Sequence, residues 1–168
     1  ATTEGENAIL ESVMLGLNEN KKTKLICELF CGSGTITLPL LKKPYQIHAF
    51  ELDKESLKSL DIAARKESFG NRVKTKVRDL KNFPLTSDEL SKYDAIIVDP
   101  PRSGAKLQFL NIARSNVSII VSISCNVNTF VRDAKILIES NYELKWVQPI
   151  DQFLFSAHVE LVAIFQLK

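Results

Sequence analysis

The chain has 168 residues, of which 45% are hydrophobic and 25% are charged, the composition of a soluble domain that buries a real core. Its formal net charge of +2 is too small to predict a polyanion partner by itself. Its three cysteines fit neither a disulfide framework nor a metal site, and no segment resembles a membrane span or a secretory signal. We therefore expect one cytoplasmic, monomeric domain over residues 1–168, without metal or membrane anchor.

Strand-like and helix-like patterns alternate along the chain. Residues 4–17 have apolar positions at helical spacing and are expected to pack on a sheet. The predicted elements that follow are, in order, 25–30 (strand), 35–42 (helix), 47–52 (strand), 54–69 (helix), 73–77 (strand), 93–98 (strand), 107–113 (helix), 117–124 (strand) and 129–140 (helix). Most of these strands are continuous apolar runs, as is typical of parallel strands buried on both faces. The run at 73–77 instead alternates apolar and basic residues, which indicates a sheet edge or a strand covered on one face.

The chain ends with two further strands, at 143–149 and 159–167, with no helix between them. The second is therefore expected to run antiparallel beside its neighbours. This pattern predicts an α/β fold with a doubly wound, mostly parallel seven-stranded sheet and an antiparallel C-terminal strand. Such a sheet resembles the Rossmann-like class I methyltransferases, whereas nicotinamide-binding domains continue the parallel alternation.

A glycine-rich segment, Glu28-Leu-Phe-Cys-Gly-Ser-Gly-Thr35, leads from the first strand into a helix. Gly32 and Gly34 stand where the backbone closely approaches a ligand, although a tight turn explains a lone Gly-x-Gly equally well. Glu51 ends the second strand, at about the separation from which an acid accepts hydrogen bonds from ribose hydroxyls. Asp79 follows the third strand, where its carboxylate would take an adenine amino group or cap a helix. Together these residues favour a cofactor pocket.

Three chemically capable residues follow the later strands. Asp99 ends the fourth strand and begins Asp-Pro-Pro-Arg-Ser-Gly, in which two prolines set a rigid turn. Cys125 ends the fifth strand, and Glu160 opens the last. Singly, these residues would be a turn cap, a small core residue and a solvated strand end. Together they place a carboxylate, a nucleophile and a proton acceptor on one rim, where open sheets bind ligands.

Four blocks give the chain a resemblance to the uracil-5 RNA methyltransferases, the bacterial family that makes 5-methyluridine in ribosomal and transfer RNA. They occur in the family's order and are Glu28 to Thr35, Asp99 to Arg102, Ser124 to Asn126, and Asp151 to Phe153 continuing through His158 to Glu160. The chain departs from the family in Glu28, usually aspartate, in Val127, usually proline, and near Leu154 and Ser156, where proline and threonine are usual.

The resemblance implies S-adenosylmethionine as cofactor and RNA as substrate, with 23S ribosomal RNA favoured over transfer RNA. It implies Cys125 as the nucleophile at uracil carbon 6, Glu160 as general base, and Asp99 and Arg102 as substrate contacts. The implied cofactor pocket comprises Glu28, Gly32, Gly34, Glu51, Asp79 and Asp99. Arg132, on the helix after Cys125, is either an RNA contact or an ordinary surface charge. Basic residues also gather at 21–24, 42–43 and 72–76, runs that are usually solvated faces.

Family members usually carry an N-terminal RNA-binding barrel and a central domain, often with an iron-sulfur cluster, so the resemblance implies a catalytic domain alone. Two alternatives remain open. Amino-group methyltransferases of adenine or cytosine use a similar Asp-Pro-Pro turn, but an aromatic residue follows it where this chain has Arg102. A non-catalytic domain that keeps a cofactor pocket is the other.

Overall fold

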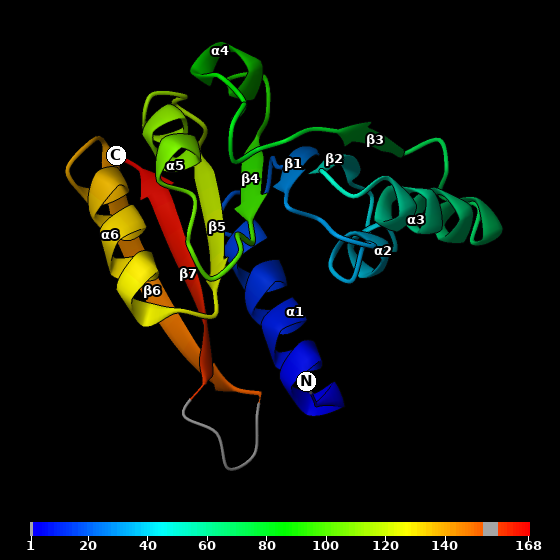
Figure 1. Cartoon of the computed structure of the whole chain (residues 1–168), viewed down its shortest axis with the longest axis horizontal. Helices are drawn as coiled ribbons and strands as arrows, with labels where there is room; N and C mark the ends of the chain where they lie inside the picture. Colours follow the sequence, from blue (N-terminus) through cyan, green and yellow to red (C-terminus); the bar gives the residue numbers. More distant parts are fainter. Residues whose placement is uncertain (1, 153–157) are drawn as a thin grey trace.

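In the computed structural model, which describes residues 2–152 and 158–168, a seven-stranded sheet carries helices on both faces (Figure 1). The order across the sheet is β3-β2-β1-β4-β5-β7-β6. β1 to β5 are parallel, and β7 is antiparallel to both β5 and β6. The strands are β1 (Leu25–Leu29), β2 (Gln46–Glu51), β3 (Val73–Val77), β4 (Ala95–Val98), β5 (Ile119–Ser124), β6 (Tyr142–Asp151) and β7 (Val159–Leu167).

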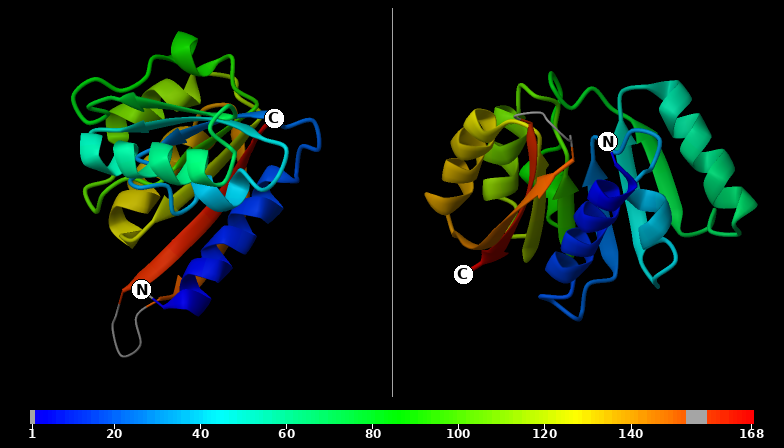
Figure 2. Two further views of the ribbon diagram at one scale, coloured as in Figure 1. Left: turned by 90° about the vertical axis from the view of Figure 1, so that its right-hand side faces the viewer. Right: turned by 90° about the horizontal axis from the view of Figure 1, so that it is seen from below.

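Helices cover the two faces in separate groups (Figures 1 and 2). One face carries α1 (Thr3–Leu17), α2 (Thr37–Leu40) and α3 (Lys54–Lys66). The other carries α4 (Ser87–Leu90), α5 (Lys106–Ala113) and α6 (Val127–Ile138). The predicted doubly wound α/β fold, with a mostly parallel seven-stranded sheet and an antiparallel C-terminal strand, is confirmed over the described residues.

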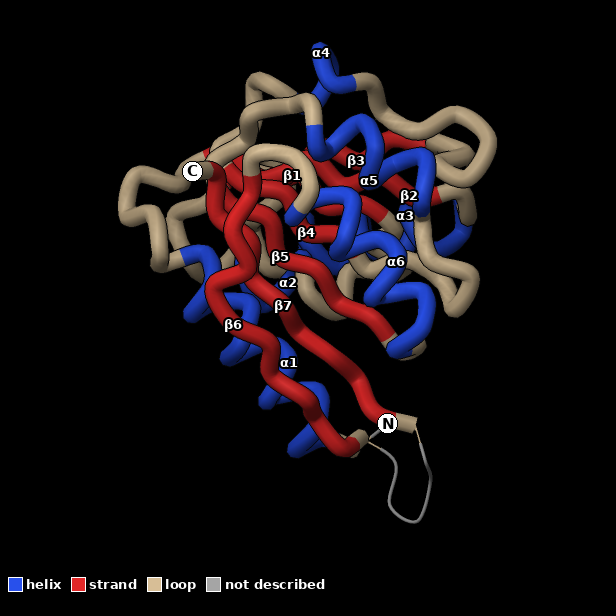
Figure 3. Tube along the Cα trace, turned by 90° about the vertical axis from the view of Figure 1, so that its left-hand side faces the viewer, coloured by secondary structure: helices blue, strands red, loops and turns tan. Residues whose placement is uncertain are grey.

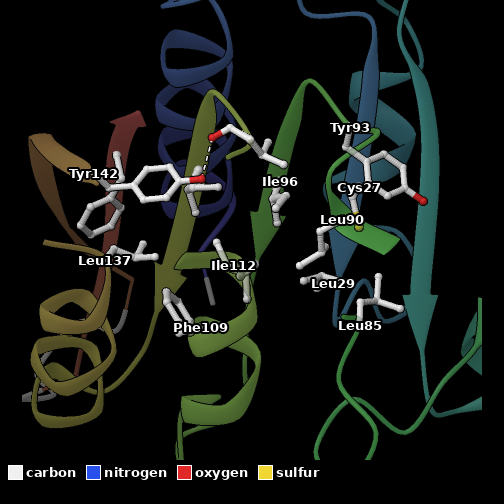
Figure 4. Close-up of a cluster of buried hydrophobic side chains, with 14 of the residues drawn as sticks. Cys27, Leu29, Leu85, Leu90, Tyr93, Ile96, Phe109, Ile112, Leu137 and Tyr142 are labelled. Carbon is white, nitrogen blue, oxygen red and sulfur yellow. Dashed lines mark hydrogen bonds between the residues drawn. The ribbon is translucent and has the colours of Figure 1, made fainter. Parts of the chain in front are cut away.

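Burial explains why the apolar runs became strands. Every residue of β4 and β5 is buried, because helices lie above and below these central strands. The core on the α5 and α6 side includes Phe109, Leu137 and Tyr142, and the Tyr142 hydroxyl donates a 2.8 Å hydrogen bond to the Val117 carbonyl (Figure 4). The alternating strand β3 lies at the sheet edge, as predicted.

Several helix predictions were wrong in extent. The helix predicted at 35–42 is reduced to the single turn α2, in which Pro39 lacks the amide that would continue the hydrogen bonding. The helix predicted at 54–69 ends at Lys66, because Ser68 takes a left-handed conformation with φ of 66°. The short helix α4 was missed, although Thr86 and Glu89 form the capping box that Thr-x-x-Glu indicates.

The N-terminal helix α1 packs on the sheet, as expected, and lies beside β6 and β7 (Figure 3). Its approach is close because Gly16 faces Ile164 of β7 and a methyl group on Gly16 would overlap that side chain. At the other end of the helix, Gly5 contacts Gln152. This packing brings the start of α1 over the carboxyl ends of the central strands. Within the part of the chain that is described, every helix is too short or too polar to cross a bilayer.

Candidate active site

The site lies where the sheet order reverses, because β1 and β4 are neighbours whose chains leave in opposite directions. Ligands of open α/β sheets bind at the carboxyl ends of strands at such a point. The glycine-rich segment follows β1 and Asp99 follows β4, so the two segments singled out in the sequence meet there. The Asp99 amide donates a 3.2 Å hydrogen bond to the Leu29 carbonyl, which joins them directly.

Gly32 and Gly34 of the glycine-rich turn are glycines for two different reasons. Gly32 has φ of 54°, its amide donates to Glu51 Oε2 at 3.0 Å, and the space where a side chain would stand is open. Gly34 has φ of 92°, and a methyl group there would overlap Leu60 of α3. Gly32 therefore leaves room for a ligand, whereas Gly34 is needed for helix packing as well as for its backbone angle.

A first pocket opens beside this turn, with Glu51, Leu80 and Asp99 in its wall; Asp79 and Pro100 also line it. Glu51 Oε1 accepts hydrogen bonds from the Leu52 and Asp53 amides at 2.8 and 3.1 Å, so its carboxylate is held rigidly at the rim. The neighbouring buried Leu80 supplies an apolar surface. A pocket with an apolar wall and fixed carboxylates suits a nucleoside, whose hydroxyl and amino groups donate hydrogen bonds.

Asp79 caps a turn rather than the helix considered from sequence. It accepts hydrogen bonds from the Asn82 amide at 3.2 Å and from Asn82 Nδ2 at 2.8 Å. These bonds lower the pKa of Asp79, so its carboxylate is an ionised acceptor at neutral pH. The residue lines the first pocket while bonded in this way.

A second cleft, of about 340 Å³, lies on the other side of Asp99. Asp99, Cys125 and Glu160 all line it, and so does the buried side chain of Gln152. The opposite wall comes from α1 and includes Glu6, Asn7 and Leu10. The structure thus brings together the three residues predicted to do chemistry, and Asp99 belongs to both cavities. No role was assigned to Gln152, although it stands in a matched block, nor to the α1 residues, which no motif marks.

The pKa values of all three groups in this cleft are raised, and the charge of Glu160 contributes to the shifts of the other two. Burial, and then the charge of Glu160, raise the pKa of Asp99 to about 7. Burial also raises the pKa of Glu160. The pKa of the Cys125 thiol is raised by burial first and by Glu160 next, and the Arg102 charge opposes this only weakly. Two carboxyl groups with raised pKa values are suited to exchanging protons near neutral pH, and the thiol needs a proton acceptor to react.

The loop after Asp99 is tied to the helix after Cys125. The Arg102 carbonyl accepts a 3.1 Å hydrogen bond from Asn126 Nδ2 and a 3.0 Å bond from Thr129 Oγ1. Asn126 also caps α6, because its Oδ1 accepts the Asn128 and Thr129 amides. The Arg102 side chain is left exposed at the rim. Asn126 therefore couples the turn that carries Cys125 to the loop that carries Arg102.

Asp133 and Arg132 also join the loop after Asp99 to α6, a role that the sequence did not indicate for either residue. Asp133 is 2% exposed, and its Oδ2 accepts the Ala105 amide at 2.8 Å. Arg132 pairs with Asp133 at 2.8 Å and donates to the Ser103 carbonyl at 3.0 Å. A methyl group on Gly104, whose φ is 72°, would lie 2.5 Å from both side chains. The structure therefore gives Arg132 partners within the chain, and no spacing in the sequence signals them.

Glu28 lies below the site rather than in the wall of either cavity. It is 2% exposed, and Thr37 Oγ1 donates a 2.6 Å hydrogen bond to its carboxyl group. Burial raises the pKa of Glu28 to about 8, although the Thr37 bond opposes the shift. Its predicted cofactor contact therefore stays a prediction.

Three residues of the family resemblance, Phe153, Leu154 and Ser156, lie outside the described residues. Among residues 2–152 and 158–168, no group of three or more His, Cys, Asp or Glu side chains is arranged to hold a metal.

Solved structures share this fold. A tRNA (uracil-54, C5)-methyltransferase of Pyrococcus abyssi, in complex with S-adenosyl-L-homocysteine, superposes with a TM-score of 0.81 at 24% identity, covering 95% of this chain and 38% of that one. The magnesium protoporphyrin IX methyltransferase of Synechocystis, with bound SAM, gives 0.74 at 15% identity, covering 98% and 80%. The fold is therefore that of the class I methyltransferases.

Sequence comparison narrows the class to a family. The family model described as tRNA (Uracil-5-)-methyltransferase matches residues 6–167. An uncharacterized RNA methyltransferase of Agrobacterium fabrum is 43% identical over 99% of this chain, and one of Mesorhizobium japonicum is 44% identical over 98%. The chain belongs to the tRNA (uracil-5-)-methyltransferase family, and it spans 39% of the length of these two relatives.

Proposed function

We propose that this chain is the catalytic domain of an S-adenosylmethionine-dependent enzyme that methylates carbon 5 of a uracil in RNA. The observation that carries the proposal is the double position of Asp99, in the wall of both the nucleoside pocket and the cleft of Cys125 and Glu160. A methyl donor in the first cavity and a base in the second would meet at this residue. The family and the names of its relatives support the same activity.

The residues present fit the cofactor. The open space at Gly32 admits a ligand close to the backbone, and the carboxylates of Glu51 and Asp79 are positioned to accept hydrogen bonds from ribose and adenine. Glu51 has three amide donors already, so it is fixed before any ligand arrives. When bound, S-adenosylmethionine supplies the methyl group that carbon 5 takes up.

Cys125 supplies what carbon 5 of uracil lacks, because that carbon is a poor nucleophile. Addition of the Cys125 thiolate to carbon 6 makes an enolate whose electron density lies on carbon 5. The thiol must first lose its proton, and the neighbouring carboxyl group of Asp99 is the acceptor within the same cleft, which leaves Glu160 free for the later proton removal. Asp99, with a pKa of about 7, also offers a hydrogen bond to the uracil edge in either protonation state.

Glu160 acts after methylation. The adduct then carries both a methyl group and a hydrogen on carbon 5, and Glu160 removes that hydrogen as a proton. The electron pair left behind forms the carbon 5 to carbon 6 double bond and expels Cys125. The raised pKa of Glu160 suits it to accept this proton. The target base must leave its stack to enter the cleft, and the exposed Arg102 stands at the rim to contact the flanking RNA.

Covalent trapping tests the proposal. In RNA that contains 5-fluorouracil, carbon 5 carries fluorine instead of hydrogen, so Glu160 has no proton to remove and the adduct persists. The chain, incubated with such RNA and S-adenosylmethionine, is expected to form a complex that survives a denaturing gel, and Cys125→Ala is expected to form none. No adduct, or one that survives Cys125→Ala, would favour the amino-group alternative. Failure to bind S-adenosylmethionine in calorimetry would show that the isolated domain is inactive.

The substrate class is tested with the same gel. We propose 23S ribosomal RNA as the natural substrate, with transfer RNA as the alternative. Fluorinated transcripts of both, at equal concentration, compete for the chain, and faster trapping of the transfer RNA transcript would reverse the assignment. RNA affinity of the chain alone is expected to be weak, because a net charge of +2 neutralises few phosphates.

A further inference from the structure

A basic groove lies on the sheet away from the active site. Its floor comes from β2 and β3, where His48 pairs in register with Lys74, and Phe50 pairs with Lys76. Residues two apart on a strand share a face, so these four side chains lie on one side of the sheet. Lys92, from the segment before β4, lines the same groove. The alternation of apolar and basic residues noted in the sequence at 73–77 thus produces a lysine-lined face.

The helices leave this face of the edge strand β3 open, whereas Phe50 of β2 is buried in the core that includes Leu90 of α4. α3 packs against β3 and β2 from the opposite side, and α4 packs on α5 instead of on the edge strand (Figures 1 and 2). The basic residue before the two lysines has a different role: Arg72 donates to the carbonyls of Lys43 and Tyr45. Of the basic residues at 72–76, Lys74 and Lys76 line the groove.

The lysines of the groove have no carboxylate partner among the described residues, although Lys92 Nζ lies over the Tyr93 ring, 5.3 Å from its centroid. Lys74 and Lys76 are exposed. The carboxylate in the groove wall, Glu89, pairs with Arg78 at 3.2 Å. His48 adds no charge, because burial, and then Lys92 and Lys74, lower its pKa. Three ammonium groups around one depression therefore favour an anion with several charges.

We propose that this groove binds the phosphate backbone of an RNA strand that flanks the methylated uridine, an inference that rests on the proposed function. Phosphate fits better than a base, because Phe50 and Tyr93 are 7% and 5% exposed and offer no ring face for stacking. The Tyr93 hydroxyl is also bonded to His48 Nδ1 at 2.8 Å. Lysine side chains contact phosphate without reading sequence.

The groove lies within reach of the same RNA. β3 is four strands from β5, the strand that Cys125 follows, which at the usual strand spacing is about 19 Å across the sheet. A single strand a few nucleotides long crosses that distance. The groove would then orient the substrate while the cleft of Cys125 selects the base.

The experiment measures binding of a fluorescein-labelled oligoadenylate by anisotropy over a series of salt concentrations. Oligoadenylate contains no uracil, so the chemistry of Cys125 cannot contribute. The variant replaces Lys74, Lys76 and Lys92 by alanine, and the matched control replaces Lys21, Lys42 and Lys43, which are exposed and outside the groove. Both variants change the net charge equally. Loss of three phosphate contacts is expected to reduce the slope of log affinity against log salt by roughly 2 for a single strand.

Equal binding by the two triple variants would overturn the proposal. Polyglutamate is measured with the same variants as a second anionic ligand. If replacing the groove lysines weakens binding of polyglutamate as much as binding of RNA, the proposal is also overturned, because the groove would then suit an acidic protein segment. A reduced slope with no covalent trapping by Cys125 would support the groove and reject the proposed function. Intact trapping with an unchanged slope would support the proposed function and reject the groove as an RNA site. Circular dichroism of both variants checks that each is folded.

Discussion

Asp133 provides the sharpest test of how the active-site loop is held. Asp133→Asn keeps the size of the side chain but turns one carboxylate oxygen into an amino group. Because Oδ2 accepts the Ala105 amide and Oδ1 accepts Arg132 Nε at 2.9 Å, either orientation of the amide sets a donor against a donor. The side chain is 2% exposed, so water cannot relieve the mismatch.

A hydrogen bond to a buried charged group contributes about 1.5–3 kcal/mol, so we expect Asp133→Asn to lower the free energy of unfolding by about 2 kcal/mol. The assay is urea denaturation followed by fluorescence of the single tryptophan. The matched control is Glu139→Gln at the C-terminal cap of the same helix; the ion pair of Glu139 with Lys135 is 3.5 Å long and both side chains are exposed. That change is expected to cost less than about 0.5 kcal/mol.

The same variant is expected to slow covalent trapping of 5-fluorouracil RNA, because the loop that carries Arg102 loses one of its attachments to α6. S-adenosylmethionine affinity, measured by calorimetry, should change less, since the first pocket is lined by Glu51, Asp79 and Leu80, which belong to other segments. If Asp133→Asn is as stable as the Glu139→Gln control, Asp133 does not hold the loop and the reasoning fails.

Three further outcomes follow from the site. Glu160→Gln is expected to transfer the methyl group and then stall, so a methylated covalent complex should accumulate on a denaturing gel; unchanged turnover would reject Glu160 as the base. The rate at which iodoacetamide alkylates Cys125, followed by intact mass, should depend on pH with an apparent pKa above that of an ordinary thiol. Glu160→Gln should lower this pKa and speed alkylation at pH 8, because a negative charge near the thiol is lost. An unaltered rate would contradict that electrostatic coupling. Glu28 has a pKa of about 8 in the fold against an ordinary 4.5, so the fold retains a proton that the unfolded chain releases between these values. The stabilisation from that proton is complete below pH 4.5 and lost as the pH rises to 8, and Glu28→Gln should therefore flatten the decline of Tm over this interval. Parallel Tm curves for the two proteins would show that Glu28 is not the group responsible.

Much of the fold could be predicted from the sequence, because strands and helices depend on periodic patterns of apolar residues and on contacts between residues close in the chain. Strands β4 and β5 are buried on both faces, and only a continuous apolar run satisfies that environment. The antiparallel end follows from two strands with too short a connection for a crossover helix. Helix lengths were predicted less well; for example, the left-handed conformation of Ser68 lies beyond the end of a helix that periodicity alone would extend.

The candidate chemistry was also visible in the sequence, because strand ends of a parallel sheet share one edge. That rule brought Asp99 and Cys125 to one rim, the start of the antiparallel last strand brought Glu160 there, and the structure places all three in one cleft. The rule does not say which neighbours a side chain has. Tertiary structure alone decided that Glu28 is buried against Thr37, and that Asp99 borders two cavities.

The sequence by itself determined the order of strands and helices, the glycines of the turn and the residue types on the rim, because each depends on neighbours within a few positions. Only the tertiary structure decided what joins these parts. Asp133 reaches the Ala105 amide, 28 positions away, and α1 closes the cleft opposite Glu160. Such contacts depend on how helices settle on the two faces of the sheet, through packing between distant residues that no local pattern records.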